Sequence, residues 1–152
     1  DLVREMLLIA GGEPLRFRQA DIAHRGHAIE VRINAEDPAH DFRPGAGVIE
    51  QYHAPGGPGI RMDSHIYPGY EVPPYYDSMI AKIIVHGRDR QEAIARMRRT
   101  LEMTVIEGIK TSVPLHLKIL AEADFQAGRL GTAFMDRFMP KPKGSSKLAE
   151  TA

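Results

Sequence analysis

The segment HAIEVRINAEDP, residues 27–38, alternates apolar and polar residues in the way that a half-buried β-strand requires. Ile29, Val31 and Ile33 fall on one side of such a strand, and the residues between them are charged or polar. Successive side chains of a strand point to opposite faces, so a period of two is typical of this structure. We predict a strand over residues 27–35 whose apolar face packs against a core.

The opposite face of this strand carries a row of polar groups. Glu30, Arg32 and Asn34 follow one another on it, at a spacing of about 7 Å. A rigid strand holds an arginine at a fixed place, which suits the recognition of a ligand. The same row is compatible with a solvated face in which an ion pair contributes about 0–1 kcal/mol. The pattern alone leaves both interpretations open.

The rest of the chain predicts mainly strands in its first half and helices in its second half. Apolar runs between turn-rich segments indicate strands, whereas apolar residues three and four apart indicate helices. We expect strands over residues 48–53, 59–63, 79–86 and 104–106, and helices over residues 1–10, 89–103 and 111–121. The expected helix caps are Asp1, Asp89, either Thr111 or Ser112, and Thr132 before a last short helix. This order favours an α+β fold with a mostly antiparallel sheet and flanking helices.

Two polar segments need interpretation before any function is assigned. In PPYYDSM, residues 73–79, two prolines and two tyrosines precede Asp77. This acid lies just before a buried strand, where it can pair with Arg32. A loop packed by its aromatic rings fits the same pattern. One face of the helix over residues 89–103 carries four arginines: Arg90, Arg96, Arg98 and Arg99. We interpret these four as a solvated helix face.

The charge balance argues against nucleic-acid and membrane partners. The chain has 20 Lys and Arg residues and 20 Asp and Glu residues, so its formal net charge is zero. A neutral chain lacks the basic surface that phosphate-rich partners need. The absence of cysteine excludes a disulfide framework and is compatible with a cytoplasmic protein. The seven histidines show no metal-ligand spacing, so we predict no metal site in this chain.

The two ends of the chain differ from its middle. Asp1 is a suitable cap for the first helix, and we therefore expect that the chain was cut from a longer protein. From Pro140 onward the sequence PKPKGSSKLAETA is rich in Pro, Ser and Lys. We expect a flexible C-terminal tail over residues 140–152.

Three segments together resemble a known family. RGHAIEVRINAEDP, HAPGGPGIRMDSHIYPGYEVPPYYDSMIAKIIVHG and EGIKTSVPLH are similar, in this order, to segments of the C-terminal domain of biotin carboxylase. The similarity runs from Asp1 to about Phe138. It implies a domain over residues 1–139, an α+β lobe that packs beside an ATP-grasp domain upstream of this chain.

The resemblance also implies a reaction. Biotin carboxylase is the ATP-dependent ligase subunit of acetyl-CoA carboxylase and serves fatty acid biosynthesis. In the family, ATP with Mg²⁺ activates bicarbonate as carboxyphosphate, which breaks down to carbon dioxide and phosphate. The deprotonated ureido nitrogen of biotin attacks the carbon dioxide, and carboxybiotin forms on a biotin carboxyl carrier protein.

The resemblance assigns roles to three residues of this chain. Arg32, in the VRIN segment, matches the arginine that contacts the biotin ureido oxygen and bicarbonate, and it is the expected catalytic residue. A fixed guanidinium can stabilise the negative charge that develops on that oxygen. Asp77 matches the acid of the PPYYDSM segment and is expected to support Arg32. Arg61, in the GIRMDSH segment, matches an arginine at the interface of the homodimer.

Other parts of the family's active site lie upstream of this chain. These are the phosphate-binding loop, the Mg²⁺-binding carboxylates, the bicarbonate lysine and the catalytic base. We therefore expect the fragment alone to be inactive and to bind neither ATP nor biotin. One alternative is a non-catalytic module for dimerisation or carrier docking. Another is the same domain of a propionyl-CoA, methylcrotonyl-CoA or pyruvate carboxylase.

Overall fold

The fold is a small antiparallel sheet with helices packed on one face. A computed structural model describes residues 1–139, and the tail expected over residues 140–152 lies outside the described residues. The helices are α1 Leu2–Ala10, α2 Arg90–Met103, α3 Val113–Ala121, α4 Ala123–Gln126 and α5 Phe134–Phe138. The strands are β1 His27–Asn34, β2 Glu36–Asp37, β3 Arg43–Pro44, β4 Gly47–Val48, β5 Gln51–His53, β6 Ile60–Ser64, β7 Glu71–Val72, β8 Met79–Gly87 and β9 Val105–Glu107.

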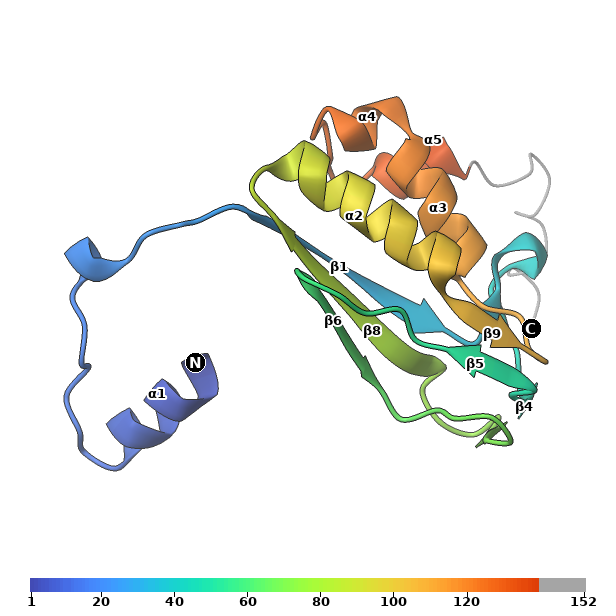
Figure 1. The fold of residues 1–152 in the computed structure, drawn as a ribbon, viewed down its shortest axis with the longest axis horizontal. Coiled ribbons are helices and arrows are strands. Elements are labelled where there is room, and N and C mark those ends of the chain that lie inside the picture. Colours follow the sequence, from blue (N-terminus) through green and yellow to red (C-terminus); the bar gives the residue numbers. More distant parts are fainter. Residues whose placement is uncertain (140–152) are drawn as a thin grey trace, which may run out of the picture.

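The central sheet consists of three antiparallel strands in the order β1-β8-β6 (Figure 1). β1 forms where the alternating segment predicted it, and its three core-facing isoleucine and valine residues are buried, whereas Glu30 and Arg32 are exposed. β8 lies between the other two strands, and its residues Ile83 and Val85 are completely buried. An interior strand with neighbours on both sides is the rigid part of such a sheet, so β8 fixes the register of β1.

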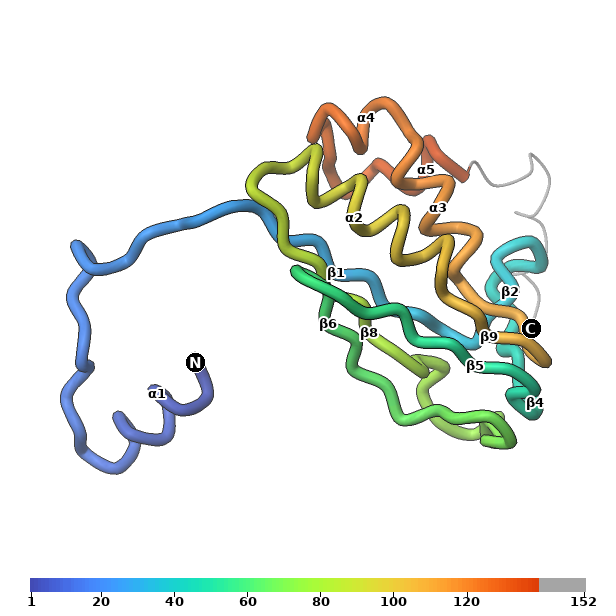
Figure 2. The backbone as a smooth tube through the Cα atoms, viewed as in Figure 1, coloured from blue at the N-terminus to red at the C-terminus, as the bar shows by residue number. Residues whose placement is uncertain are grey.

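Helices α2 and α3 lie on one face of this sheet, and no helix within residues 1–139 covers the opposite face (Figures 1 and 2). α2 begins as predicted at Asp89, whose carboxylate accepts a hydrogen bond from the Glu92 amide at 2.9 Å. Met97 and Leu101 of α2 are almost completely buried against the sheet. These observations confirm the predicted α+β fold with mostly antiparallel pairing and flanking helices.

The single strand expected over residues 48–53 is wrong, because the chain changes partner in the middle of it. β4 pairs with β7, whereas β5 pairs with β9, and Figure 2 shows β5 and β9 side by side. Between them, the amide of Ile49 donates to the Tyr70 carbonyl at 2.9 Å and the amide of Glu50 donates to the Glu107 carbonyl at 2.8 Å. Ile49 is completely buried at this crossover, so the apolar run that resembled one strand serves two short ladders.

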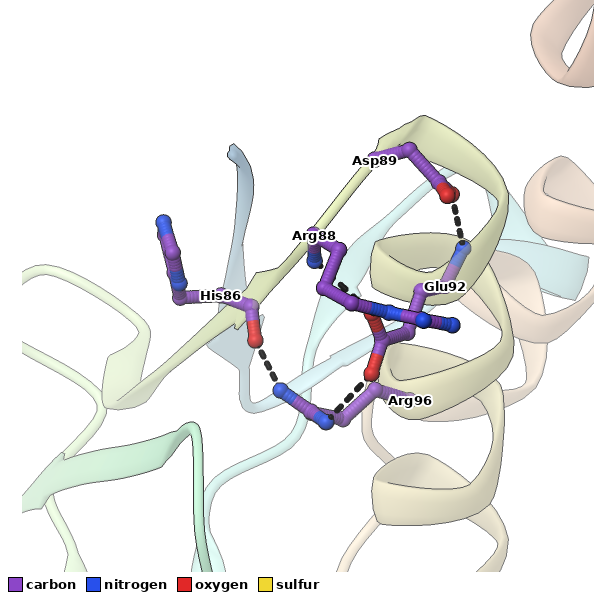
Figure 3. Close-up of polar contacts among 5 residues, drawn as sticks. All are labelled: His86, Arg88, Asp89, Glu92 and Arg96. Carbon is purple, nitrogen blue, oxygen red and sulfur yellow. Dashed lines mark hydrogen bonds and ion pairs between the residues drawn. The ribbon is translucent and has the colours of Figure 1, made fainter. Parts of the chain in front are cut away.

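The prediction of a solvated arginine face on α2 is wrong for Arg96. One of its terminal nitrogens pairs with Glu92 Oε1 at 2.9 Å, and the other donates to the backbone carbonyl of His86 (Figure 3). The other oxygen of Glu92 accepts from the amide and the Nε of Arg88 at 2.8 and 2.9 Å. This network joins the first turns of α2 to the end of β8, because an arginine side chain is long enough to reach the neighbouring strand.

Arg90 also departs from the prediction. It is half-buried and donates to the Phe125 carbonyl, with its guanidinium 4.9 Å from the centre of the Phe125 ring. Arg98 and Arg99 are exposed, as predicted. Two of the four arginines therefore bind helix α2 to its neighbours, and two face solvent.

The first helix forms where it was predicted, with the Asp1 carboxylate accepting from the Arg4 amide at 3.0 Å. It lies apart from the sheet, at the end of an extended segment (Figure 1). Most of its apolar residues are exposed, and Leu2 is 84% accessible. No helix within residues 1–139 is long and apolar enough to cross a membrane.

The end of the described chain differs from the prediction in two ways. The last helix, α5, has Ala133 rather than Thr132 at its cap position, and no side chain caps it. Helix α4 was not predicted at all. Its cap is Glu122, whose carboxylate accepts from the amides of Asp124 and Phe125. A four-residue helix is too short to show a periodic apolar pattern.

Candidate functional site

Arg32 lies near the end of β1, and it alternates with the buried residues of that strand, so its side chain lies on the face that α2 and α3 leave open. Its side chain is 56% exposed, whereas its neighbours Val31 and Ile33 point into the core and are 8% and 0% exposed. A strand whose other face is completely buried cannot rotate without exposing its apolar side chains. Arg32 therefore projects from a firmly held backbone.

A shift in strand register brings Met79 next to Arg32. Arg32 lies opposite Lys82 and Ile33 lies opposite Ala81, but Asn34 lies opposite Met79, so that Ile80 is skipped. Bulges of this kind re-aim a side chain at the end of a ladder. Here the Sδ atom of Met79 accepts a hydrogen bond from Arg32 Nε at 3.1 Å.

Asp77 lies close to a terminal nitrogen of the same guanidinium. Its Oδ2 atom is 4.0 Å from Arg32 Nη2, and its Oδ1 atom accepts from the Met79 amide at 2.8 Å. The predicted proximity of Arg32 and Asp77 is thus present, although Asp77 is 71% exposed and such a pair contributes only about 0–1 kcal/mol. The alternative of a loop packed by its aromatic rings is not supported, since Tyr75 and Tyr76 are 87% and 81% exposed.

The segment that carries Asp77 is attached to the end of β1. The Ser78 carbonyl accepts from the Ala35 amide at 2.7 Å, and the Ser78 hydroxyl donates to Glu36 Oε1. The same Glu36 oxygen accepts from Asn34 Nδ2 at 3.2 Å. Asn34 thus contributes to holding this loop, and its position in the polar row of β1 reflects a structural contact within the chain.

Helix α3 holds the outer edge of β1. Ser112 Oγ accepts from the Asn34 amide at 3.0 Å and donates to the Arg32 carbonyl at 3.3 Å. His116 Nε2 lies 2.9 Å from the same carbonyl, and it must carry the proton because a carbonyl oxygen only accepts. Burial lowers the pKa of His116 below its usual value of 6.5, and the hydrogen bond to the Arg32 carbonyl opposes this shift. Ser112 therefore joins two elements rather than capping α3 with its side chain.

The open face of the sheet carries further charged residues in register with Arg32. Lys82 of β8 lies between Arg32 of β1 and Asp63 of β6 in one row of paired residues. A cavity of about 220 Å³ is lined by this lysine, Met79 and the Asp63–His65 segment. Lys82 interrupts the apolar run IAKIIV, and this charged residue within a buried strand is a sequence signal for a residue on the open face. The position of Met79 has no such signal, because it depends on the register shift.

Arg61 occupies a separate position on the same face. It lies opposite Ile84 on β6, with β8 between it and β1. Its Nη2 atom is 2.9 Å from Asp63 Oδ2, its Nε atom donates to both oxygens of that carboxylate, and the side chain is 73% exposed. Hydrogen bonding to Asp63 raises the pKa of Arg61. Arg32 and Asp77 thus form one group and Arg61 with Asp63 a second one.

The described part of the chain contains no group of three or more His, Asp or Glu residues placed to hold a metal ion. A guanidinium on an open, rigid surface is suited to binding a planar oxyanion or a developing negative charge, because it is always protonated and presents several donors in one plane. The geometry thus favours recognition of an anionic or carbonyl-bearing ligand at Arg32.

Comparison with known proteins gives a consistent result. A family model described as the biotin carboxylase C-terminal domain matches residues 30–137. A pyruvate carboxylase subunit of Methanothermobacter thermautotrophicus is 54% identical over 138 residues, which are 91% of this chain and 28% of that protein. Biotin carboxylase of Allochromatium vinosum is 52% identical over 139 residues, which are 91% of this chain and 31% of that protein. The chain thus spans less than a third of the length of these relatives.

Solved structures resemble the fold as a whole. The biotin carboxylase domain of a thermophilic 2-oxoglutarate carboxylase bound to bicarbonate has a TM-score of 0.85 and 46% identity, over 90% of this chain and 31% of that one. A dimer of this domain from Hydrogenobacter thermophilus, in complex with MgADP, ADP and bicarbonate, has the same TM-score and identity, over 90% of this chain and 30% of that one. The biotin carboxylase subunit of pyruvate carboxylase has a TM-score of 0.85 and 48% identity, with the same coverage.

Proposed function

The chain belongs to the biotin carboxylase C-terminal domain family, and on that premise we propose that residues 1–139 form the C-terminal lobe of a biotin-dependent carboxylase in which Arg32 acts on biotin. The observation that supports this role is the place of Arg32 on a rigid strand, with its terminal nitrogens on the open face of the sheet. The uncovered face leaves room for a second lobe to enclose a ligand against it.

In this proposal Arg32 stabilises charge on the ureido group of biotin. When the ureido nitrogen gives its proton to a base of the upstream lobe, negative charge spreads onto the ureido oxygen, and a guanidinium placed beforehand can donate to it. The nitrogen then forms a bond to the carbon of carbon dioxide, giving carboxybiotin. Arg32 keeps its positive charge throughout, as guanidinium groups in proteins do. Asp77 supports the orientation of the guanidinium from its Nη2 side.

ATP and Mg²⁺ belong, in this proposal, to an ATP-grasp lobe such as the one that precedes this domain in the family. A 2-oxoglutarate carboxylase relative was solved with MgADP and bicarbonate, which supports the use of the same ligands. Residues 1–139 contain no group of three or more His, Asp or Glu side chains placed to hold a metal ion. The acyl acceptor is open, because the relatives include pyruvate carboxylase as well as biotin carboxylase subunits.

The proposed partners are a biotin carboxyl carrier protein and a second copy of the same protein. The relative from Hydrogenobacter thermophilus was solved as a dimer, which supports a homodimer here. We place Arg61 at that interface, because its side chain is 73% exposed and held in one orientation by Asp63. A fixed, exposed arginine loses little conformational entropy when it meets a partner.

The proposal is tested by Arg32→Ala in a biotin carboxylase that carries this chain as its C-terminal domain. Loss of one donor to a developing oxyanion typically lowers the rate by about 10²–10³-fold, and we expect this loss in the carboxylation of free biotin at saturating ATP and bicarbonate. Arg98→Ala is the matched control, since Arg98 is an exposed helix arginine whose only ion pair within residues 1–139 is with Glu102. Near-normal carboxylation by a folded Arg32→Ala enzyme would refute the role.

A further inference from the structure

The guanidinium of Arg32 is held along one edge only. Its Nε–H is taken by Met79 Sδ at 3.1 Å, and its Nη2 atom is 4.0 Å from the Asp77 carboxylate. No other side-chain hydrogen bond or ion pair of Arg32 is found within residues 1–139. An arginine has five N–H donors in a rigid fork. Most of these donors, including both on Nη1, are therefore available to a ligand on the open face.

Met79 is itself firmly placed by three features of the backbone. The register shift at Ile33–Asn34 sets it opposite Asn34, on the same face as Arg32. Its amide donates to Asp77 at 2.8 Å, and the preceding residue, Ser78, accepts from the Ala35 amide at 2.7 Å. Without the shift, Met79 would share a face with Ala81, which points into the core. The contact with Arg32 is thus a product of the bulge.

A thioether is an unusual but suitable acceptor for this position. Methionine sulfur is neutral and accepts hydrogen bonds weakly, so it can direct the Nε–H without compensating the positive charge. A carboxylate at the same place would form a bidentate pair with the guanidinium. Such a pair would neutralise the charge that the ureido oxygen needs. The neutral acceptor at Nε therefore leaves Asp77, 4.0 Å from Nη2, as the only acid that pairs with Arg32 within residues 1–139.

We propose that Met79 is a positioning residue for biotin carboxylation, whose sulfur fixes the Nε edge of Arg32 and so directs the Nη1 and Nη2 donors toward the substrate. The inference rests on the function proposed for Arg32. Met79 acts through Arg32 and has no contact with substrate of its own in this proposal. Its effect therefore depends on its capacity to accept a hydrogen bond and on its lack of charge, rather than on its volume.

Three substitutions separate this role from simple packing. In a biotin carboxylase that carries this chain, Met79→Leu keeps the apolar volume and removes the acceptor, Met79→Gln keeps a neutral acceptor, and Met79→Glu introduces a charged one. One hydrogen bond of this strength corresponds to about a 3–10-fold effect. We expect kcat/KM for free biotin to fall about 3–10-fold in Met79→Leu, to stay within about 2-fold in Met79→Gln, and to fall further in Met79→Glu.

The order of activity among the Met79 variants distinguishes a positioning role from a packing role. A packing role predicts that Leu is tolerated best and that Gln is worse, so Met79→Leu at or above the activity of Met79→Gln overturns the proposal. A double-mutant cycle gives an independent readout, because residues that act through one another are not additive. Met79→Leu should have no further effect on the Arg32→Ala background, and an equal effect on both backgrounds also overturns the proposal.

The Arg32 and Met79 variants together distinguish a failure of the function proposed for Arg32 from a failure of the role proposed for Met79. If Arg32→Ala is nearly as active as the parent enzyme, the function proposed for Arg32 fails. If Arg32→Ala loses activity but Met79→Leu does not, the role of Arg32 stands and only the role of Met79 fails.

Discussion

Replacement of Ser112 by Ala should loosen the attachment of β1 to α3. Ser112 is 5% exposed, and its hydroxyl accepts from the Asn34 amide at 3.0 Å and donates to the Arg32 carbonyl at 3.3 Å. The Arg32 carbonyl keeps its second donor, His116, at 2.9 Å. The amide and the carbonyl of Asn34 both bond to Ser112, so the substitution leaves the amide without this partner in a partly buried place.

The expected loss follows from these contacts. An unsatisfied buried donor costs about 1–3 kcal/mol, and we expect the free energy of unfolding to fall by about 2 kcal/mol. With an m-value of about 1–3 kcal/mol per molar in urea, the midpoint of unfolding should fall by about 1 M. Far-UV circular dichroism follows the transition, and amide hydrogen exchange at Asn34 should become faster in the variant.

Two control variants test the reasoning. Thr111→Ala removes a neighbouring hydroxyl that makes no hydrogen bond within residues 1–139, so its effect should stay within about 0.5 kcal/mol. Ser112→Asn supplies a residue that caps helices well but does not reproduce the two contacts to β1. The reasoning is refuted if Ser112→Ala is no more destabilising than Thr111→Ala, or if Ser112→Asn has the stability of the parent.

Two further predictions concern the stability of the fold. Gly59 has φ +74°, and an added Cβ would meet Arg96 and lie 2.7 Å from the His86 carbonyl, so Gly59→Ala should lower the free energy of unfolding by about 1–3 kcal/mol. In thermal melts Gly56→Ala, where a Cβ meets open space, should stay near the parent, and equal melting temperatures for the two variants would contradict this. The lowered pKa of His116 means that the unfolded chain binds its proton at a higher pH than the folded chain, so this group lowers stability as the pH falls below about 6.5. Between about pH 8 and pH 5, His116→Gln should show a smaller loss of stability in urea unfolding than the parent, and identical losses would count against the burial of this imidazole.

Local patterns predicted the framework of the fold. The period of two in β1 placed Arg32 on the face opposite the core, because alternation is set by the geometry of one strand. Asp89 predicted the beginning of α2 for a similar reason, since a helix cap acts within one turn. The pattern offered a pair of Asp77 with Arg32 as one of two interpretations, and the resemblance assigned Asp77 a supporting role.

Long-range contacts decided the details of the site. Met79 meets Arg32 across 47 residues of sequence, and the register shift that joins them is a property of two paired strands. Ser112 was predicted as a possible helix cap, yet its hydroxyl is used by β1, because a buried backbone amide at Asn34 needs a partner. Arg96 was assigned to solvent, yet it reaches the end of β8.

The amino-acid sequence by itself therefore determined which residues could form a strand, a helix or a core, and it placed Arg32 on the open face. Only the tertiary structure decided which groups surround that arginine. The physical reason is that periodicity and capping are satisfied within a few residues, whereas hydrogen-bond partners are chosen after distant segments have packed. The direction in which Arg32 points is a property of the folded sheet and its bulge.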